Sequence, residues 1–303
     1  MAKATNPRQI KRKIRAVQNL KKITKAMEMV SAAKLRRTQE ALEAVRPYAD
    51  KLLELMGRLA ASAEQLEAPL LVARPVVRRV GLVVVAADKG LCGSYNSNVL
   101  RLAHRLLAEI QAPVELYTVG RKAREAFRKR GREPAAHWQG LPPNVGFREV
   151  REIVEQVVGA YRREELDEVR VVYTEFINAM TFRPRASRFL PLGGTAGFGS
   201  EAAGQEGTGG AARPAGGPCW LFEPSPERIF EQLLPRFVEV RFYRLLLEAL
   251  ASEHGARMQA MRNATDNAQE LIDTLTLTFN KARQAAITKE LLDIVGGAEG
   301  LRG

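Results

Sequence analysis

The chain has 303 residues, of which 46% are hydrophobic and 27% are charged, and its formal net charge is +13. The hydrophobic content excludes a disordered protein, and no apolar run approaches the ~20 residues that a membrane-spanning helix needs. Within positions 1–40, twelve Lys and Arg residues stand against two acidic residues, so +10 of the net charge lies in one segment. Such a segment suits a polyanion, which is nucleic acid, an anionic membrane surface or an acidic protein.

The first long segment has the pattern of one extended helix. Asn6-Pro7 is typical of a helix start. Apolar residues then recur at steps of three and four, first at Ile10, Ile14, Val17, Leu20, Ile23, Met27 and Val30, and again from Leu35 to Ala63. The step from Val30 to Leu35 is five, so we expect the apolar stripe to shift there. Pro47 predicts a kink or a bend. The basic N-terminus has no small-residue cleavage site before this pattern, so we interpret it as mature structure and not as a transit peptide.

The middle of the chain alternates between strand and helix patterns. Residues 64–79 hold Pro69 and Pro75 and have the composition of a linker. The strand patterns cover residues 79–87, 114–119, 168–176 and 186–192, and the helix patterns cover 98–110, 122–129 and 147–161. The first strand is a continuous β-branched run, which is typical of a strand buried on both faces. We therefore predict a Rossmann-like α/β domain with a mainly parallel sheet.

A second long helix pattern closes the chain. Residues 193–218 are rich in Gly and Ala and predict a flexible insertion, which a short strand at 219–222 follows. Ser225, Pro226 and Glu227 then indicate the start of a helix that runs to about Val295, with an early kink at Pro235. Its apolar seam keeps an unbroken heptad spacing at Met258, Met261, Thr265, Ala268, Ile272, Leu275, Phe279, Ala282 and Ala286.

These patterns predict three parts. Residues 1–65 form an N-terminal coiled-coil helix, residues 66–224 form the α/β domain, and residues 225–303 form a C-terminal coiled-coil helix. The ends of a compact central domain lie close together, so the two helices should pair as an antiparallel rod. A uniform seam against a shifting one would make this rod asymmetric. From Asn280 onward the second helix should extend beyond its partner, and Ala282 and Ala286 then become outward-facing contact surface.

The sequence offers no catalytic constellation. The segment DKGLCGSYN (Asp88–Asn96) follows a strand and precedes a helix, where phosphate-binding loops occur, but it matches neither GxxxxGK[ST] nor GxGxxG. A structural turn is the favoured interpretation. The three histidines and two cysteines show no metal-ligand spacing, so we expect no metal, no cofactor and no catalytic residue. A disulfide between Cys92 and Cys219 is the less favoured alternative to buried or incidental thiols in a reducing compartment.

Specific segments resemble the gamma subunit of F-type ATP synthases. They are KKITKAMEMVSAAKLRR (Lys21–Arg37), RPYA (Arg46–Ala49), DKGLCGSYN, and a C-terminal signature at Ile287, Thr288, Glu290, Asp293, Gly297 and Ala298. The resemblance covers the whole chain in order. The segment 193–218 departs from the family because it is longer and richer in Gly than the usual connection, and it lacks the cysteine pair of the redox-regulated chloroplast form.

The resemblance implies a central stalk without catalytic residues of its own, as a non-catalytic subunit of a proton-transporting enzyme. The terminal helices would turn inside a ring of alpha and beta subunits, and the α/β domain would contact the epsilon subunit and the membrane c-ring. The complex would lie peripherally at the cytoplasmic face of a bacterial-type cell membrane. By resemblance, the subunit-contact residues are Lys25, Met27, Arg283, Gln284 and Thr288.

The alternative is a basic coiled-coil scaffold or a nucleic-acid-binding protein. Residues 1–47 contain no aromatic side chain, which disfavours nucleic-acid binding and favours an acidic protein partner. A nucleotide-binding enzyme built on the α/β domain is a third hypothesis.

Overall fold

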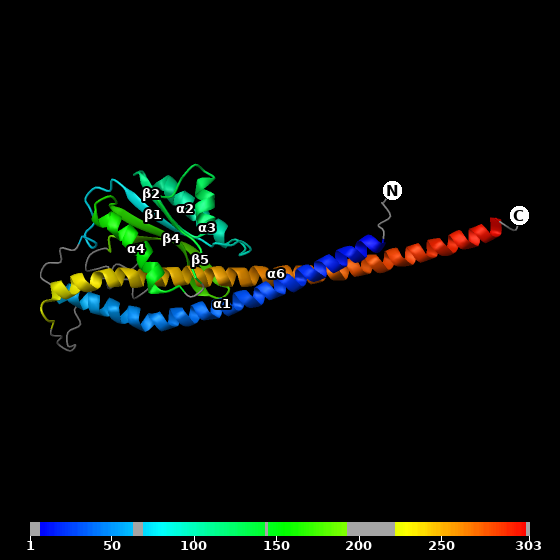
Figure 1. Ribbon diagram of the computed structural model, residues 1–303, viewed down its shortest axis with the longest axis horizontal. Coiled ribbons are helices and arrows are strands. Elements are labelled where there is room, and N and C mark those ends of the chain that lie inside the picture. The colour runs from blue at the N-terminus through cyan, green and yellow to red at the C-terminus, as the bar shows by residue number, and fades with distance from the viewer. Residues whose placement is uncertain (1–6, 63–68, 143–144, 193–221, 301–303) are drawn as a thin grey trace. The chain divides into compact units, whose positions relative to one another are not determined.

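The computed structural model describes residues 7–62, 69–142, 145–192 and 222–300. It divides into two compact units, which are treated separately below. Unit 1 comprises residues 1–31 and 257–303, and unit 2 comprises residues 32–256. Two long helices, α1 (Pro7–Ser62) and α6 (Pro226–Gly300), each contribute to both units (Figure 1). No helix in the described ranges is both long and apolar enough to span a membrane.

Unit 2 is built on a five-stranded sheet in the order β3-β2-β1-β4-β5. Its first four strands in that order are parallel, and β5 pairs with β4 in the antiparallel direction. The strands are β1 (Val80–Val85), β2 (Val114–Val119), β3 (Ala136–Trp138), β4 (Glu168–Asn178) and β5 (Thr181–Leu190). The connecting helices are α2 (Tyr95–Glu109), α3 (Arg121–Arg128) and α4 (Phe147–Arg162). The predicted α/β class with a mainly parallel sheet is confirmed.

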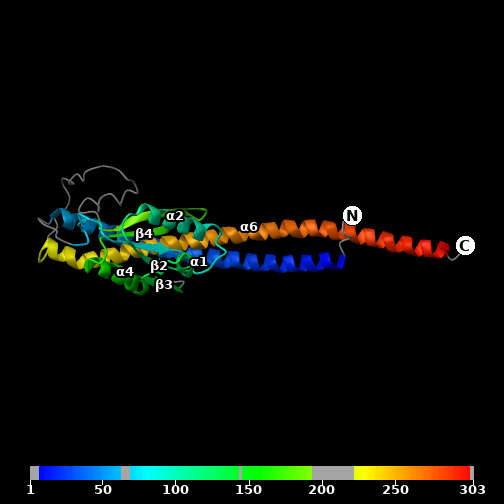
Figure 2. The same ribbon diagram turned by 90° about the horizontal axis from the view of Figure 1, so that it is seen from above.

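Alternate residues of β1 enter two different cores, because neighbouring side chains of a strand point to opposite faces of its sheet. Leu82 and Val84 pack with the buried faces of α2 and α3. Val83 and Val85 pack on the other face, in a larger core that includes α4 and the unit 2 parts of α1 and α6. All six residues of β1 are buried, which is why its sequence is a continuous apolar run. Figure 2 shows the ribbon of the sheet and its helices from above.

Within unit 2, one side of α6 packs into the larger core. Phe242 stacks edge-on against Phe189 of β5, with ring centroids 5.7 Å apart. The ring of Tyr243 packs against that of Phe147 of α4, with ring centroids 4.6 Å apart. The Tyr243 hydroxyl donates a hydrogen bond to the carbonyl of Val145. Both α1 and α6 continue without a break through Pro47 and Pro235. Figure 1 shows α1 bent in its second half.

Two strands differ from the sequence expectation. The strand expected at 186–192 begins at Thr181, because Asn178 forms a tight turn in which its side-chain oxygen accepts from the backbone N–H groups of Met180 and Thr181. Pro184 is tolerated in β5 because β5 is an edge strand. β3 was not expected, since three residues are too few to show a periodicity. The short strand expected at 219–222 and the insertion at 193–218 lie outside the described residues, apart from Phe222.

Unit 1 is an antiparallel pair of helical segments. The hydroxyl of Thr265 donates to the hydroxyl of Thr24 at 2.8 Å, and the Lys21 ammonium donates to the side-chain oxygen of Gln269. Each pair of residue numbers adds to 289 or 290, which fixes the register of the two helices. The expected α6 seam is buried or half-buried from Met258 to Phe279, the part that lies opposite α1, so the seam is confirmed over that range.

The expected shift of the α1 seam after Val30 is wrong. Leu20, Ile23 and Val30 are 53%, 57% and 57% exposed. A series of buried and half-buried positions keeps steps of three and four without a slip, at Ile10, Ile14, Val17, Lys21, Thr24, Glu28, Ser31 and Leu35. Met27 is also half-buried. Small residues face α6 because they allow the two helix backbones to approach closely. Thr24 and Ser31 of α1 lie opposite a part of α6 that carries Thr265 and Ala268. The α1 residues that face α6 therefore keep their regular spacing, whereas Leu20, Ile23 and Val30 lie on the exposed side of the helix.

Candidate functional site

The segment Asp88–Asn96 lies at the carboxyl end of β1, where open α/β sheets commonly bind ligands. The Asn96 side-chain oxygen accepts from the backbone N–H of Ala87 at 3.0 Å, and its amide donates to the sulfur of Cys92 at 3.1 Å. Cys92 and Tyr95 are buried with Ala87 and Ala256, and Phe182 packs against them. The Tyr95 hydroxyl donates to the carbonyl of Ala249 on α6. This loop is held by its own side chains and packs onto α6.

Asp88 connects the turn to two later parts of the chain. Its two oxygens accept from the backbone N–H groups of Arg121 and Gly140, both at 2.9 Å. The carboxylate therefore occupies the N-terminal end of α3, which is the anion-binding position of that helix. These contacts give Asp88 a structural role in the turn.

The histidines and cysteines stay apart. His104 lies on α2 against Phe127, with ring centroids 4.8 Å apart, while His137 is on β3 and His254 is buried in α6. Burial, with Arg130 and Arg132 nearby, lowers the pKa of His104. Cys92 is buried, and Cys219 lies outside the described residues. Within the described part of the chain, no group of three or more His, Cys, Asp or Glu residues could hold a metal ion.

The outer face of α1 in unit 1 combines apolar and basic side chains. Leu20, Ile23 and Val30 project away from the seam, beside exposed lysines and arginines. Lys25 is exposed and forms an ion pair with Glu28 at 3.1 Å, and Met27 is half-buried. The helix pair therefore leaves this row of apolar side chains exposed to solvent.

The C-terminal part of α6 forms a second surface. The register places the first residues of α1 opposite positions near 283, so the later residues of α6 have no counterpart on the described part of α1. Ala282 and Ala286 are half-buried, whereas Arg283, Gln284 and Thr288 are exposed. Ile287, Leu291 and Ile294 are 48%, 58% and 68% exposed and follow one another at steps of four and three. They form a single apolar stripe, which we call the tail stripe.

The five expected contact residues divide between these two surfaces. Lys25 and Met27 lie on α1, and Arg283, Gln284 and Thr288 lie on α6 around the tail stripe. From the sequence, Ile287 was singled out only as part of the C-terminal signature, and Leu291 and Ile294 were not singled out. The stripe lies one position away from the seam that ends at Ala286, so the seam spacing does not predict it.

Comparison with known proteins decides the family. A family model described as ATP synthase matches residues 6–301. An ATP synthase gamma chain of Symbiobacterium thermophilum is 44% identical over 301 residues, covering 99% of this chain and 100% of its own length. This chain belongs to the ATP synthase gamma family. Another gamma chain, from Heliobacterium modesticaldum, is 45% identical over 298 residues and covers 97% and 98% of the two chains.

Solved structures agree with this membership of the gamma family. The central stalk and c-ring structure of the Tetrahymena thermophila mitochondrial ATP synthase contains a chain that is 26% identical to this one, with a TM-score of 0.58. The match covers 80% of this chain and 99% of that chain. A chain of the Euglena gracilis mitochondrial ATP synthase has a TM-score of 0.66 at 20% identity, over 97% and 94% of the two chains, and shows the same fold. The resemblance drawn from the sequence segments is confirmed.

Proposed function

We propose that this chain is the rotary central stalk of an F-type ATP synthase. In this proposal the paired helices turn inside a ring of alternating alpha and beta subunits, and the α/β domain contacts the epsilon subunit and the membrane c-ring. Rotation couples proton flow to the sites on beta that make or hydrolyse ATP. The complex lies peripherally at the cytoplasmic face of the cell membrane, and this chain contributes contacts and no catalytic group.

One observation carries the proposal, which is the tail stripe on α6. A soluble helix that ends with exposed Ile287, Leu291 and Ile294 leaves apolar surface in water unless another protein covers it. A ring of subunits around this part of α6 would cover the apolar surface. It would still allow rotation, because apolar contacts are non-directional. The basic side chains of α1 supply the complementary element, since they attract acidic loops of a surrounding ring.

The exposed positions also explain how one rod can treat three sites differently. A ligand or a subunit shifts an equilibrium only through differential contact free energy between states. The exposed surface of the rod is not uniform, since it presents Lys25 on α1 and Arg283 and Gln284 on α6. Each beta subunit would therefore meet a different face at each rotational position.

The test is reconstitution of the full chain with purified alpha and beta subunits. We expect a stable complex with stimulated ATPase activity, and stepwise rotation of a bead fixed to the α/β domain when ATP is added. A chain that fails to co-elute with the hexamer, or that binds DNA with a steep salt dependence instead, would support the basic scaffold or nucleic-acid-binding alternative.

The tail stripe can be tested by a triple serine variant, Ile287→Ser with Leu291→Ser and Ile294→Ser. These side chains are exposed, so the melting temperature should stay within about 2 °C of the parent. Rotation should become slower and more irregular in single-molecule traces. Val76→Ser is the control, because Val76 is 60% exposed but belongs to unit 2. Equal rotation in the triple variant and the control would contradict the role given to the stripe.

Met27→Lys tests the proposed contact surface on α1 in unit 1. Met27 is half-buried on α1, next to Glu28, and a lysine there would place a new charge at a moving interface. We expect weaker coupling, seen as less ATP-driven proton pumping for each ATP hydrolysed. Met27→Leu conserves volume and should pump normally. Unchanged pumping in the lysine variant would count against this contact.

A further inference from the structure

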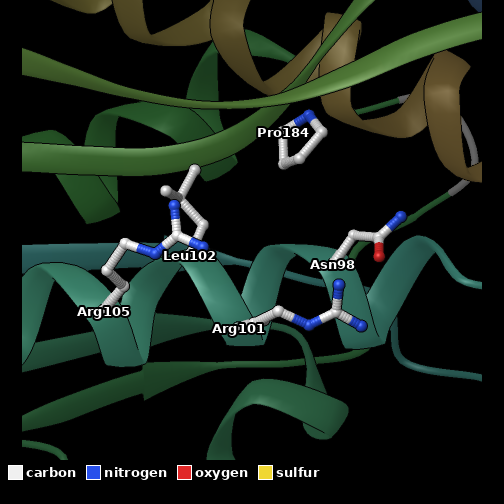
Figure 3. Close-up of a pocket in the computed structure, with 5 residues that line it drawn as sticks. All are labelled: Asn98, Arg101, Leu102, Arg105 and Pro184. Atoms are coloured by element: carbon white, nitrogen blue, oxygen red, sulfur yellow. The ribbon is translucent and has the colours of Figure 1, made fainter.

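Two hollows border α2 in unit 2, and both are lined by cations. One, of about 490 Å³, lies between α2 and α3 and is lined by Ser97, Leu100, Arg101, His104, Ala126, Lys129 and Arg130. The other, of about 240 Å³, lies between α2 and β5 and is lined by Asn98, Arg101, Leu102, Arg105 and Pro184 (Figure 3). Arg101 belongs to both hollows, so they form one continuous surface across the ridge of α2.

The cations of this surface form no ion pair within the described part of the chain. No carboxylate lines either hollow. Glu125 of α3 is paired with Lys122 at 2.9 Å and interacts more weakly with Lys129, and Glu133 is paired with Arg128 at 3.0 Å. Among the described residues, Arg101, Arg105, Lys129 and Arg130 have no ion-pair partner within 4.0 Å. Four cations therefore face solvent around two hollows.

The positions of these cations favour an extended ligand. Arg101 and Arg105 are one helical turn apart and project along the same side of α2 in Figure 3. Lys129 and Arg130 follow the C-terminal end of α3, on the far side of the ridge. A small anion is normally held by donors that converge on one point, and here the donors lie on both sides of a helix.

The apolar lining narrows the class of ligand. Leu100 and Ala126 line the larger hollow, and Leu102 and Pro184 line the smaller one. The ring of His104 is fixed against Phe127 and adds a flat wall. Cations around small apolar hollows match a polypeptide in which carboxylates alternate with small or apolar side chains.

We propose that the surface formed by α2, α3 and β5 docks an acidic polypeptide segment of a partner subunit, with Arg101 at its centre. Carboxylates of the segment pair with Arg101 and Arg105 on one side of α2 and with Lys129 and Arg130 on the other. This surface is separate from the rod surfaces of unit 1, and the inference stands whether or not the chain rotates.

The test uses the full chain and a fluorescein-labelled peptide in which glutamate alternates with alanine, with binding followed by fluorescence anisotropy at low ionic strength. The double variant Arg101→Glu with Arg130→Glu should bind about tenfold more weakly, since two exposed attractions become repulsions. Both side chains are exposed, so the variant should fold; circular dichroism checks this. Arg101→Gln with Arg130→Gln should show an intermediate loss.

The matched control reverses two charges on the more basic segment, as Lys11→Glu with Arg12→Glu on α1. Both residues are exposed, and the control should change peptide affinity less than about twofold if the α2 surface is the site. Equal losses in the two double variants would show non-specific attraction to a basic protein and overturn the proposal. Inorganic tripolyphosphate is the second probe, and displacement of the peptide at matched charge would identify a phosphate site and overturn it too.

Discussion

Gly120 is the residue whose replacement should be least tolerated in the α/β domain. Its φ is +93°, and a Cβ built there would lie 2.0 Å from the carbonyl oxygen of Ala86. Gly120→Ala therefore combines backbone strain with a clash against β1, and we expect a loss of at least about 3 kcal/mol in the free energy of unfolding. Urea unfolding followed by circular dichroism measures the change.

Gly131 supplies the matched control. Its φ is +71°, but nothing lies within 4 Å of an added Cβ. Gly131→Ala should cost only the conformational penalty of about 1 kcal/mol. If the two alanine variants lost the same stability, the contact with Ala86 would have no role.

The free energy of unfolding should depend on pH through Glu248. It lies in α6 near Arg244, Tyr173, Glu175 and Arg185, and burial raises the pKa of its carboxyl above the ordinary value of 4.5 against the opposing effect of Arg244. The folded state therefore keeps the proton when the unfolded state has lost it, and the free energy of unfolding falls as pH rises through that window.

Glu248→Gln removes this titration. The difference in melting temperature between the variant and the parent should shift in favour of the variant when pH is raised from 4 to 7. Thermal melts at both values check it, with the exposed Glu43→Gln as the control. A difference that stays constant with pH would contradict the raised pKa.

At the residue scale, the sequence identified the DKGLCGSYN turn but not what its residues do. Asp88 accepts hydrogen bonds from Arg121 and Gly140, which are 33 and 52 positions away. Contacts over such separations leave no local pattern. The tail stripe was missed for a different reason: Ile287 follows seam residue Ala286 by one position, so the stripe lies on a neighbouring face of the helix and does not continue the recognised seam.

At the scale of elements, the paired hydroxyls of Thr24 and Thr265 define how the two helices of unit 1 meet. The Thr265 hydroxyl lies 2.8 Å from both Thr24 Oγ1 and the carbonyl of Met261, and Thr24 donates to the carbonyl of Lys21. A double-mutant cycle with Thr24→Val and Thr265→Val should give a coupling energy of about 1 kcal/mol. Additive single effects on urea unfolding would show that the contact contributes nothing.

The element boundaries followed from the sequence far better than the faces of α1. A three-and-four step pattern predicts a helix whichever side is buried, so α1 and α6 were found. Leu20, Ile23 and Val30 form a stripe as regular as a seam, yet they are exposed. Hydrophobicity alone cannot distinguish an apolar stripe that packs against its own chain from an apolar stripe that stays exposed. In α1, small residues determine which face packs against α6.

At the scale of the whole molecule, the charge of residues 1–40 should govern the rate of assembly. Twelve basic and two acidic residues in that segment would attract an acidic ring over a longer distance at low salt, where the Debye length is larger. We expect the association rate constant with the alpha–beta hexamer to fall by about tenfold between low and physiological ionic strength, while the dissociation rate changes little. Stopped-flow mixing measures both rates. A salt-independent association rate would exclude steering by this segment.

The hydroxyl pair in the helix seam also has a mechanical consequence. Two helices wound around each other and loaded with torque relieve the load by sliding lengthwise, and a purely aliphatic seam can re-seat its side chains after such a slip. Thr24 and Thr265 meet in one register only, and Lys21 with Gln269 repeats the constraint one turn away. These two contacts resist shear between the helices. If the rod turns as proposed, Thr24→Val with Thr265→Val would lower its torsional stiffness without lowering its affinity for any partner subunit.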